Sequence, residues 1–434
     1  MKKISLIIFT LSLAAVHLQA QQVTVNNELK DLINKSFGYF PKVKEVENTV
    51  TTAEQRLELT KLNKMPEVEG VASYNYVRPK IVIPFPMGPN GDLVPFQFAP
   101  VHNGNLALQG SYTLFDFGRI KANVERSKDD LQYAKHNVEN TKSQLANQVS
   151  TIYYNIVFFK KAISIQDSVI AFLNENKKMI DAQIKNGDAL KFDLLNIQAS
   201  IDNAQNQKTD LQNNLEKQYN LLEYTTGLKQ NNGSAFDFDV PYADVDGLLG
   251  IAQAGNLDFI MAKDKIKQAE SDVNVAKLGD KPNVSLGAGA GVKNGYVPDV
   301  NNFKFNYSAG VTLSVPIYTG GKTKQQIKIA ETQVKQNELA IATLSNTYRR
   351  DIEQSLTDIK TNLERIKNTQ AQIEQTQYAQ KLAAIRFQNG VGTNLELTNA
   401  STNVQTAALT KLQYQYQLCL AKVQLANLLG YQYW

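Results

Sequence analysis

Two long segments of this chain resemble each other, and this internal repeat constrains the fold more than any other feature. Leu114–Arg119 is followed 202 residues later by Pro316–Gly321. Asn186–Leu194 is followed 203 residues later by Asn389–Leu397, and about 70 residues separate the two motifs in each copy. A duplication of this length predicts one architecture built from two homologous halves, and it argues against a catalytic domain with a single centre.

The first 20 residues are typical of a secretory signal peptide. Lys2 and Lys3 precede an apolar stretch from Ile4 to Val16, and Leu18-Gln19-Ala20 provides a cleavage site. The apolar stretch is too short to span a bilayer as a helix. We therefore expect export with loss of residues 1–20, a first structural repeat at 21–247 and a second at 248–434.

The composition argues against a nucleic-acid-binding protein and against an enzyme. Lys and Arg number 46 and Asp and Glu 41, and the basic residues are spread along the chain rather than clustered. No Ser-His-Asp set, HExxH motif or CxxC pair is present. We expect no catalytic residue, no metal site and no cofactor. The single cysteine, Cys419, lies in an apolar helical segment and is predicted to be a buried packing residue.

Long helices are predicted in each repeat. Apolar residues recur every seven positions, which predicts coiled-coil packing, at Leu131, Val138, Leu145, Ile152 and Phe159 and at Ile352, Ile359, Ile366 and Ile373. The proline-free segments 121–185 and 323–388 predict two helices of about 65 residues, each about 100 Å long. Shorter helices are predicted at 28–64 and 248–279, and return helices are predicted to end at Thr226 and Leu429.

Between the helices, two segments alternate strictly in hydropathy. In Phe305–Val315 the polar or small face consists of Asn306, Ser308, Gly310, Thr312 and Ser314, and Val284–Val292 alternates in the same way. A half-buried strand of a soluble protein also alternates. The length, however, fits a transmembrane barrel strand with an apolar outer face and a polar lumen face. Segments 106–115 and 71–78 are the corresponding strands of the first repeat, and 81–101 and 293–304 are predicted to be exposed loops.

At this point the sequence resembles a known family. Leu114-Phe115-Asp116-Phe117-Gly118-Arg119 and Val315-Pro316-Ile317-Tyr318-Thr319-Gly320-Gly321 resemble the strand-to-helix signature of the TolC-like outer-membrane efflux proteins. Arg386–Leu397 is similar to the turn that joins two helices at the tip in that family. The resemblance covers essentially the whole mature chain, with both repeats in order.

The resemblance implies a mainly α fold with transmembrane β structure. In the family, a homotrimer shares a 12-stranded barrel in the outer membrane, four strands coming from each chain, and the helices continue as a coiled-coil periplasmic tunnel. Barrel closure supports the trimer independently. Four strands cannot close a barrel, and an open sheet edge is not viable in lipid, whereas three sets of four strands can close.

The resemblance also implies the function and the partners. The chain is expected to be a passive exit duct of a tripartite efflux or secretion system, with an outer-membrane lipid surface, a periplasmic adaptor protein and an inner-membrane transporter as partners. Drugs, metals and proteins all remain open as cargo. The expected adaptor-docking residues at the periplasmic tip are Gly187, Arg386, Gly390, Gly392 and Thr393.

The resemblance further places Asp193, Glu396 and Asn399 at the tunnel constriction. The family often has an acidic residue where this chain has Asn399, which weakens the expectation of a cation-binding acidic ring. Asp193 and Glu396 have a second possible role, as charges stabilised by the dipole at a helix N-terminus. For the whole chain the alternative is a periplasmic coiled-coil adaptor or scaffold, which would not need two sets of alternating strands.

Overall fold

The computed structural model describes residues 23–86, 91–187, 189–229 and 233–434. The predicted signal peptide lies outside the described residues. Within the part that is described, no helix combines the length and apolarity that crossing a membrane requires.

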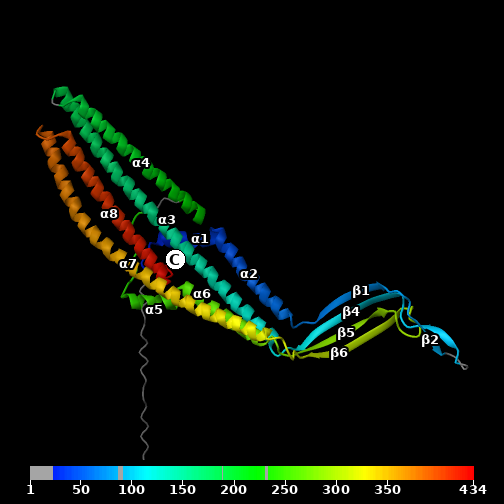
Figure 1. Ribbon diagram of the computed structural model, residues 1–434. Helices are drawn as coiled ribbons and strands as arrows, with labels where there is room; N and C mark the ends of the chain where they lie inside the picture. The colour runs from blue at the N-terminus through cyan, green and yellow to red at the C-terminus, as the bar shows by residue number, and fades with distance from the viewer. Residues whose placement is uncertain (1–22, 87–90, 188, 230–232) are drawn as a thin grey trace, which may run out of the picture. The chain divides into compact units, whose positions relative to one another are not determined.

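The elements follow one another in nearly the same order in both halves of the sequence (Figure 1). The first half contains α1 Asn27–Tyr39, α2 Pro41–Leu62, β1 Glu67–Tyr76, β2 Val82–Pro86, β3 Leu93–Gln97, β4 His102–Phe115, α3 Arg119–Asn186 and α4 Lys191–Thr226. The second half contains α5 Val245–Gly255, α6 Leu257–Lys277, β5 Asn283–Lys293, β6 Lys304–Ser314, α7 Lys322–Gln388 and α8 Asn394–Leu429. The long helices α3 and α7 contain 68 and 67 residues, so the predicted lengths are confirmed.

Three details of the predicted elements are wrong. Each first helix is interrupted, at Phe40 and at Asn256, where the backbone is extended. Pro41 disfavours helical geometry at Phe40, and the Asn256 side chain accepts the Asp258 N–H at 2.8 Å and so starts α6. Strand β1 spans Glu67–Tyr76 rather than 71–78, and β4 begins at His102 rather than at residue 106. The pairing of β1 with β4 extends from Glu67 with Ser111 to Tyr76 with His102. The predicted loop 81–101 contains the antiparallel hairpin β2–β3.

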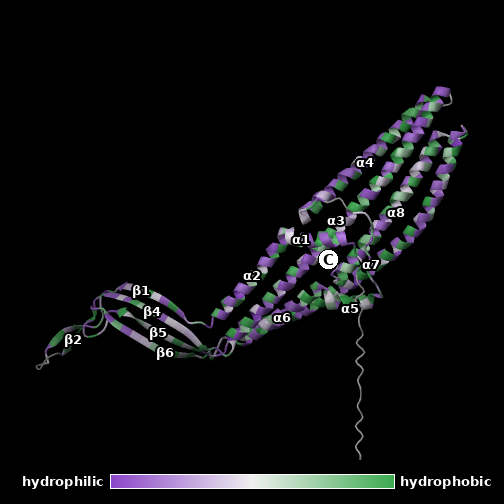
Figure 2. Ribbon diagram, turned by 180° about the vertical axis from the view of Figure 1, so that it is seen from behind, coloured by the Kyte–Doolittle hydropathy of each residue, from purple (hydrophilic) through white to green (hydrophobic). Residues whose placement is uncertain are grey.

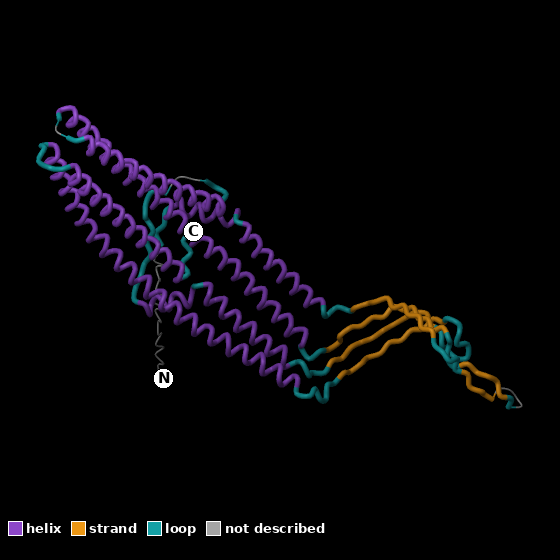
Figure 3. The backbone as a smooth tube through the Cα atoms, turned by 45° about the horizontal axis from the view of Figure 1, so that its top comes forward, coloured by secondary structure: helices purple, strands orange, loops and turns teal. Residues whose placement is uncertain are grey.

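The four long strands form one antiparallel sheet in the order β1-β4-β5-β6, as labelled in Figure 1. Figure 3 shows the same sheet as orange strands. The central pair β4–β5 joins the two halves of the chain, and β1 and β6 are its free edges. All four helical connections, to α2, α3, α6 and α7, leave from one end of the sheet. The hairpin β2–β3 and the β5–β6 loop therefore lie at the opposite end.

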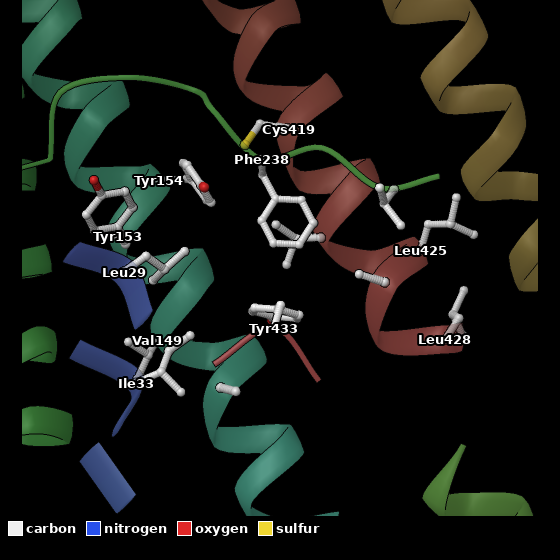
Figure 4. Packing of buried hydrophobic residues seen from close by; sticks show 14 of the residues in the cluster. Leu29, Ile33, Val149, Tyr153, Tyr154, Phe238, Cys419, Leu425, Leu428 and Tyr433 are labelled. Carbon is white, nitrogen blue, oxygen red and sulfur yellow. The ribbon is translucent and has the colours of Figure 1, made fainter. Parts of the chain in front are cut away.

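One compact unit comprises the helical segments up to Lys44, Glu139–Phe259 and Leu344–Trp434. Its core draws on α1, α3, α8, the segment that follows α4, and the C-terminal residues (Figure 4). Tyr153 and Tyr154 of α3 are nearly inaccessible, and Phe238 packs edge-on against Tyr433 with ring centroids 5.1 Å apart. Cys419 belongs to this cluster and is 3% exposed, which confirms its predicted packing role.

The second unit, Glu45–Val138 and Ile260–Thr343, contains the sheet and the helical segments next to it. Polar contacts join α3 and α6 within this unit. The Arg126 guanidinium forms an ion pair with Asp272 at 2.6 Å. Ser271 donates to the Asp129 carboxylate at 2.5 Å, and His136 Nδ1 contacts Asp264 at the same distance. Helices α3 and α6 are therefore held together next to the sheet by an ion pair and by hydrogen bonds.

Residues with positive φ mark the repeat more finely than the sequence motifs do. Four pairs share this geometry at a constant spacing of 203 residues: Phe117 and Gly320, Gly118 and Gly321, Gly187 and Gly390, and Gly227 and Gly430. The Leu114–Arg119 motif and its copy in the second half therefore align at a spacing of 203 residues rather than 202. The two compact units each draw on both halves, so the boundary between the repeats at residues 247 and 248 stays a prediction.

Candidate functional site

The register of the sheet separates an apolar face from a polar face. Tyr307 pairs with Ala290, and Ala290 pairs with Leu108, so these side chains share one face. That face consists mainly of Val68, Leu106, Leu108, Tyr112, Leu286, Ala290, Val292, Phe305, Tyr307, Val311 and Leu313. Tyr307 is 80% exposed in the single chain, so this face requires an apolar environment.

The opposite face carries all five predicted lumen residues together with polar residues from the other strands. The polar side chains on this face include Ser73, Asn105, Gln109, Ser111, Ser285, Asn306, Ser308, Thr312 and Ser314. Glycines 287, 289 and 291 of β5 add no side-chain bulk to it. In Figure 2 the strands carry both hydrophilic and hydrophobic residues. The sheet thus has the two faces that a barrel wall between lipid and water needs.

An aromatic cluster lies at the end of the sheet that is remote from the helices. The Tyr74 hydroxyl contacts His102 Nδ1 at 2.7 Å, and the rings of Tyr76 and His102 have centroids 5.3 Å apart. The Arg78 guanidinium lies 5.7 Å from the centre of the Tyr76 ring. Aromatic residues on the apolar face near one end of barrel strands are typical of the membrane–water interface.

At the other end of the sheet, β4 passes directly into α3. The Asp116 carboxylate accepts the N–H groups of Gly118 and Ile120, at 3.0 and 2.5 Å, and so caps the new helix. Arg119 donates to the carbonyl oxygens of Leu278 and Lys281, at 3.3 and 3.0 Å. The Asp-Phe-Gly-Arg motif therefore turns the chain and ties it to the end of α6.

The turn between α7 and α8 contains four of the five predicted tip residues. The Arg386 carbonyl accepts the N–H groups of Val391 and Gly392, both at 3.0 Å. A Cβ on Gly392 would lie 2.9 Å from Arg386 Cβ, so only glycine fits without a shift. The Thr393 hydroxyl accepts the Glu396 N–H at 3.1 Å and starts α8. Gly390 has a φ of 72°, as its predicted role in the turn requires.

The turn between α3 and α4 contains the fifth tip residue, Gly187, with a φ of 85°. Just beyond it, the Asp193 carboxylate accepts the Leu190 N–H at 3.2 Å. Glu396 occupies the corresponding position in the first turn of α8 and lies 3.7 Å from Arg386. Both carboxylates therefore occupy helix N-termini, and Asn399 lies one turn further along α8.

The two helical hairpins are held together near their turns. Asn176 of α3 donates to the Asn394 side chain of α8 at 3.0 Å, and both residues are buried. Phe387, Ile197 and Leu397 belong to the same apolar cluster. A groove of about 610 Å³ is lined by residues that begin α4 and α8, including Asp193 and Thr393, whereas Glu396 and Asn399 do not line it.

Sequence reasoning missed the apolar surface at these turns. Phe192, Leu195 and Leu395 are 66%, 62% and 68% exposed, and Phe192 and Leu395 line the groove. A signal was present, because Phe192 and Leu395 occupy the same position after the two Asn-Gly turns. Exposed apolar residues that gather around a groove are typical of protein interaction sites and of ligand-binding grooves.

The sequence pattern of the outer membrane efflux protein family matches residues 32–228 and 248–431. The chain belongs to this family. Its members are channels rather than enzymes, so this chain is an outer-membrane efflux channel with a helical periplasmic extension. The alternative of a periplasmic adaptor or scaffold is therefore wrong.

Individual outer membrane efflux proteins are distant relatives in sequence. The toluene efflux pump outer membrane protein TtgI of Pseudomonas putida is 21% identical over 387 residues, which cover 86% of this chain and 78% of TtgI. Outer membrane protein TolC of Escherichia coli is 22% identical over 352 residues, or 75% of this chain and 69% of TolC.

Solved structures confirm the predicted fold class. The outer-membrane channel OprN matches with a TM-score of 0.75 at 18% identity, over 93% of this chain and 90% of OprN. The outer membrane protein VceC of Vibrio cholerae matches with a TM-score of 0.74 at 18% identity, over 94% and 97% of the two chains. The chain is mainly helical with one sheet of four long strands, and these channel structures share that fold.

Proposed function

We propose that this outer membrane efflux protein is the passive exit duct of a tripartite pump, assembled as a homotrimer with a periplasmic adaptor protein and an inner-membrane transporter. The observation that carries the proposal is the two-faced, four-stranded sheet with open edges at β1 and β6. Such edges cannot face lipid. Three sheets joined edge to edge satisfy them and enclose the polar face as a lumen.

We propose the turns α3–α4 and α7–α8 as the docking surface for the adaptor. The groove between the starts of α4 and α8 presents Phe192 and Leu395 beside the Asp193 carboxylate. An amphipathic helix of a partner can place apolar residues in such a groove and basic residues next to the carboxylate. Gly187, Arg386, Gly390, Gly392 and Thr393 shape the two turns, and Thr393 also lines the groove.

Asp193, Glu396 and Asn399 are proposed as the tunnel constriction. In the trimer, three copies of each first helical turn would surround one axis, so the carboxylates would form a negative ring. Removing both charges, by Asp193→Asn with Glu396→Gln, should lower cation preference in planar-bilayer recordings. The same charges also stabilise their helix starts, so thermal unfolding of the variant serves as the control for a purely structural role.

A photo-crosslinking experiment tests the docking surface. A benzoylphenylalanine at Leu395 should capture the adaptor in cells that carry the whole pump. Leu221, an exposed leucine of α4 far from both turns, is the matched control and should capture none. Equal capture at both positions, or capture at Leu221 alone, would show that the adaptor docks elsewhere.

Complementation tests the efflux role with a defined cargo. TtgI is named for toluene export, so small apolar compounds are the first class to test. Deleting the gene should sensitise the host to such compounds, and the intact chain should restore resistance. If the deletion strain keeps full resistance to solvents and dyes, another class of cargo uses this duct.

A further inference from the structure

The hairpin β2–β3 has an apolar face that nothing in the described part of the single chain covers. Alternation along the two strands puts six large apolar side chains on this face: Ile81, Ile83, Phe85, Val94, Phe96 and Phe98. Ile83 is 49% exposed and Phe85 is 48% exposed. β2 and β3 contain no charged residue, and Gln97 is their only side chain with hydrogen-bonding groups. We call these six residues the hairpin face.

Lipid does not suit this surface. The hairpin follows the aromatic cluster of Tyr74, Tyr76 and His102, which marks the end of the apolar sheet face. A two-stranded hairpin also has unpaired backbone groups on both edges, and such groups cannot be satisfied within hydrocarbon. Water alone does not suit it either, because an isolated two-stranded hairpin is only marginally stable.

The edges of the hairpin are poor sites for adding another strand. Pro84 pairs with Pro95, and Pro86 pairs with Leu93. The Phe98 N–H donates to the Ile81 carbonyl, so the residues of the hairpin face form the hydrogen-bonded pairs between the two strands. The prolines lie in the alternate pairs, where the backbone nitrogen of each residue points outward from the edge of the hairpin. Proline has no N–H to offer there. This geometry allows the hairpin to associate with another surface through the hairpin face but not through its edges.

The base of the hairpin is anchored to the end of the barrel wall. Val77 donates its N–H to the Val101 carbonyl at 2.9 Å, and Gln97 donates to the Ala99 carbonyl at 2.7 Å. Gln97 also contacts Asn301 of the β5–β6 loop at 3.5 Å. The hairpin therefore starts from the external rim of the barrel, and in the trimer three hairpins start from that one rim.

The dimensions allow these hairpins to meet. Strands about 4.8 Å apart with a tilt of about 40° give a twelve-stranded barrel a radius of about 12 Å. A five-residue strand extends about 17 Å. Each hairpin is therefore long enough to reach the barrel axis from the rim.

We propose that the three hairpins of one trimer pack against one another through the hairpin face and form an apolar seal over the external mouth of the barrel. The proposal rests on the trimer proposed above. The occupant of each hairpin face is a second copy of the same surface, brought within reach by barrel closure. Cargo must part this seal in order to leave, and the seal restricts entry from outside.

Cysteine crosslinking tests the seal. Ile83→Cys places a thiol on the hairpin face, and Val82→Cys places one on the opposite face at nearly the same height. Both are made with Cys419→Ala, so that each chain has one thiol. After mild oxidation of outer membranes, non-reducing gels should show abundant disulfide-linked dimers for Ile83→Cys and few for Val82→Cys. Only dimers are expected, because one disulfide joins two of the three copies.

Two further measurements make each outcome decisive. Oxidised Ile83→Cys channels should show a several-fold lower single-channel conductance that a reductant restores.

If native mass spectrometry shows intact trimers while Ile83→Cys gives no more dimer than Val82→Cys, the seal is refuted and the trimer stands. If the thiol introduced by Ile83→Cys is protected from aqueous maleimide without dimer formation, the seal is refuted as well, since a lipid or another protein would then cover the face. Absence of a trimer in the unsubstituted protein would instead refute the proposed assembly.

Discussion

At the scale of single residues, glycines at the helix turns were predictable and the strand-to-helix turn was not. Asn-Gly after a long helix indicates a positive φ, and both Gly187 and Gly390 have it. Phe117 also has a positive φ, of 56°, which the sequence could not indicate because bulky residues rarely adopt it. The hydrogen bonds that the preceding residue, Asp116, accepts hold the turn in this conformation.

We expect Gly390→Val to impair export without disturbing the trimer. A Cβ at Gly390 would meet no atom within 4 Å, so the cost comes from the positive φ alone. That cost is about 1–2 kcal/mol, which is enough to reshape an exposed turn. Export in a complementation assay and trimer mass on native gels are the two readouts.

Gly250→Ala is the matched control for Gly390→Val. Gly250 lies within α5, and its added Cβ would also meet nothing within 4 Å. Alanine in a helix is about 0.5–1 kcal/mol more favourable than glycine, so export should be unchanged. Normal export by Gly390→Val would mean that the turn geometry is not needed for docking.

A second expectation at this scale concerns pH. Burial raises the pKa of the Cys419 thiol to about 12, from an ordinary value of 9.0. The folded chain therefore keeps this proton when the unfolded chain would lose it. The resulting stabilisation is fully present below about pH 9 and is lost as the pH rises towards 12. Burial raises the pKa of Tyr433 to about 12 as well, so the two groups act in the same direction.

Thermal unfolding measured from pH 7 to pH 11 should show this loss directly. The unfolding temperature should fall above pH 9, and the fall should be smaller for Cys419→Ala than for the unsubstituted chain. At pH 8 the folded protein should react with maleimide far more slowly than the unfolded chain, since the thiolate is the reactive form. Fast labelling of the folded protein would contradict the buried position of the thiol.

At the scale of helices and strands, period and length predicted the elements that run without interruption. The seven-residue repeat predicted coiled-coil packing over 131–159 and 352–373. The absence of proline over 121–185 and 323–388 predicted α3 and α7 almost to their ends. Local side-chain chemistry decided the rest. The breaks at Phe40 and Asn256 depend on a following proline and on a capping amide, and the hairpin β2–β3 is formed by a proline-rich segment that resembles a loop. The groove at the turns depends on packing between helices that the sequence does not specify.

The two faces of β6 lead to a paired prediction. Val311 pairs with Leu286 and shares the apolar face, whereas the next residue, Thr312, points to the polar face. Arginine at Val311 should cost about 2–4 kcal/mol if it lies near the middle of the membrane, and arginine at Thr312 should be tolerated in the lumen. Heat resistance of the assembled barrel on gels measures the difference. Equal loss at both positions would contradict the assignment of the faces.

At the scale of the whole molecule, the single chain is unfinished, because β1 and β6 are open edges and the apolar sheet face is uncovered. Assembly must therefore accompany insertion into the membrane. Native mass spectrometry in detergent should give about three times the mature mass, with no stable monomer. A monomer that persists in extracted outer membranes would contradict the edge-to-edge barrel.

The helical core has a consequence for how the chain is exported. Residues near its beginning, such as Leu29 and Phe37, pack in the same cluster as residues at its end, and the Phe37 and Trp434 rings meet edge to face at 5.8 Å. A polypeptide threaded through a translocation pore from its N-terminal side brings these two regions together only after α8 and Trp434 have passed. The core that joins α1, α3 and α8 is therefore completed only at the end of translocation, and the chain cannot fold fully before it has crossed the pore.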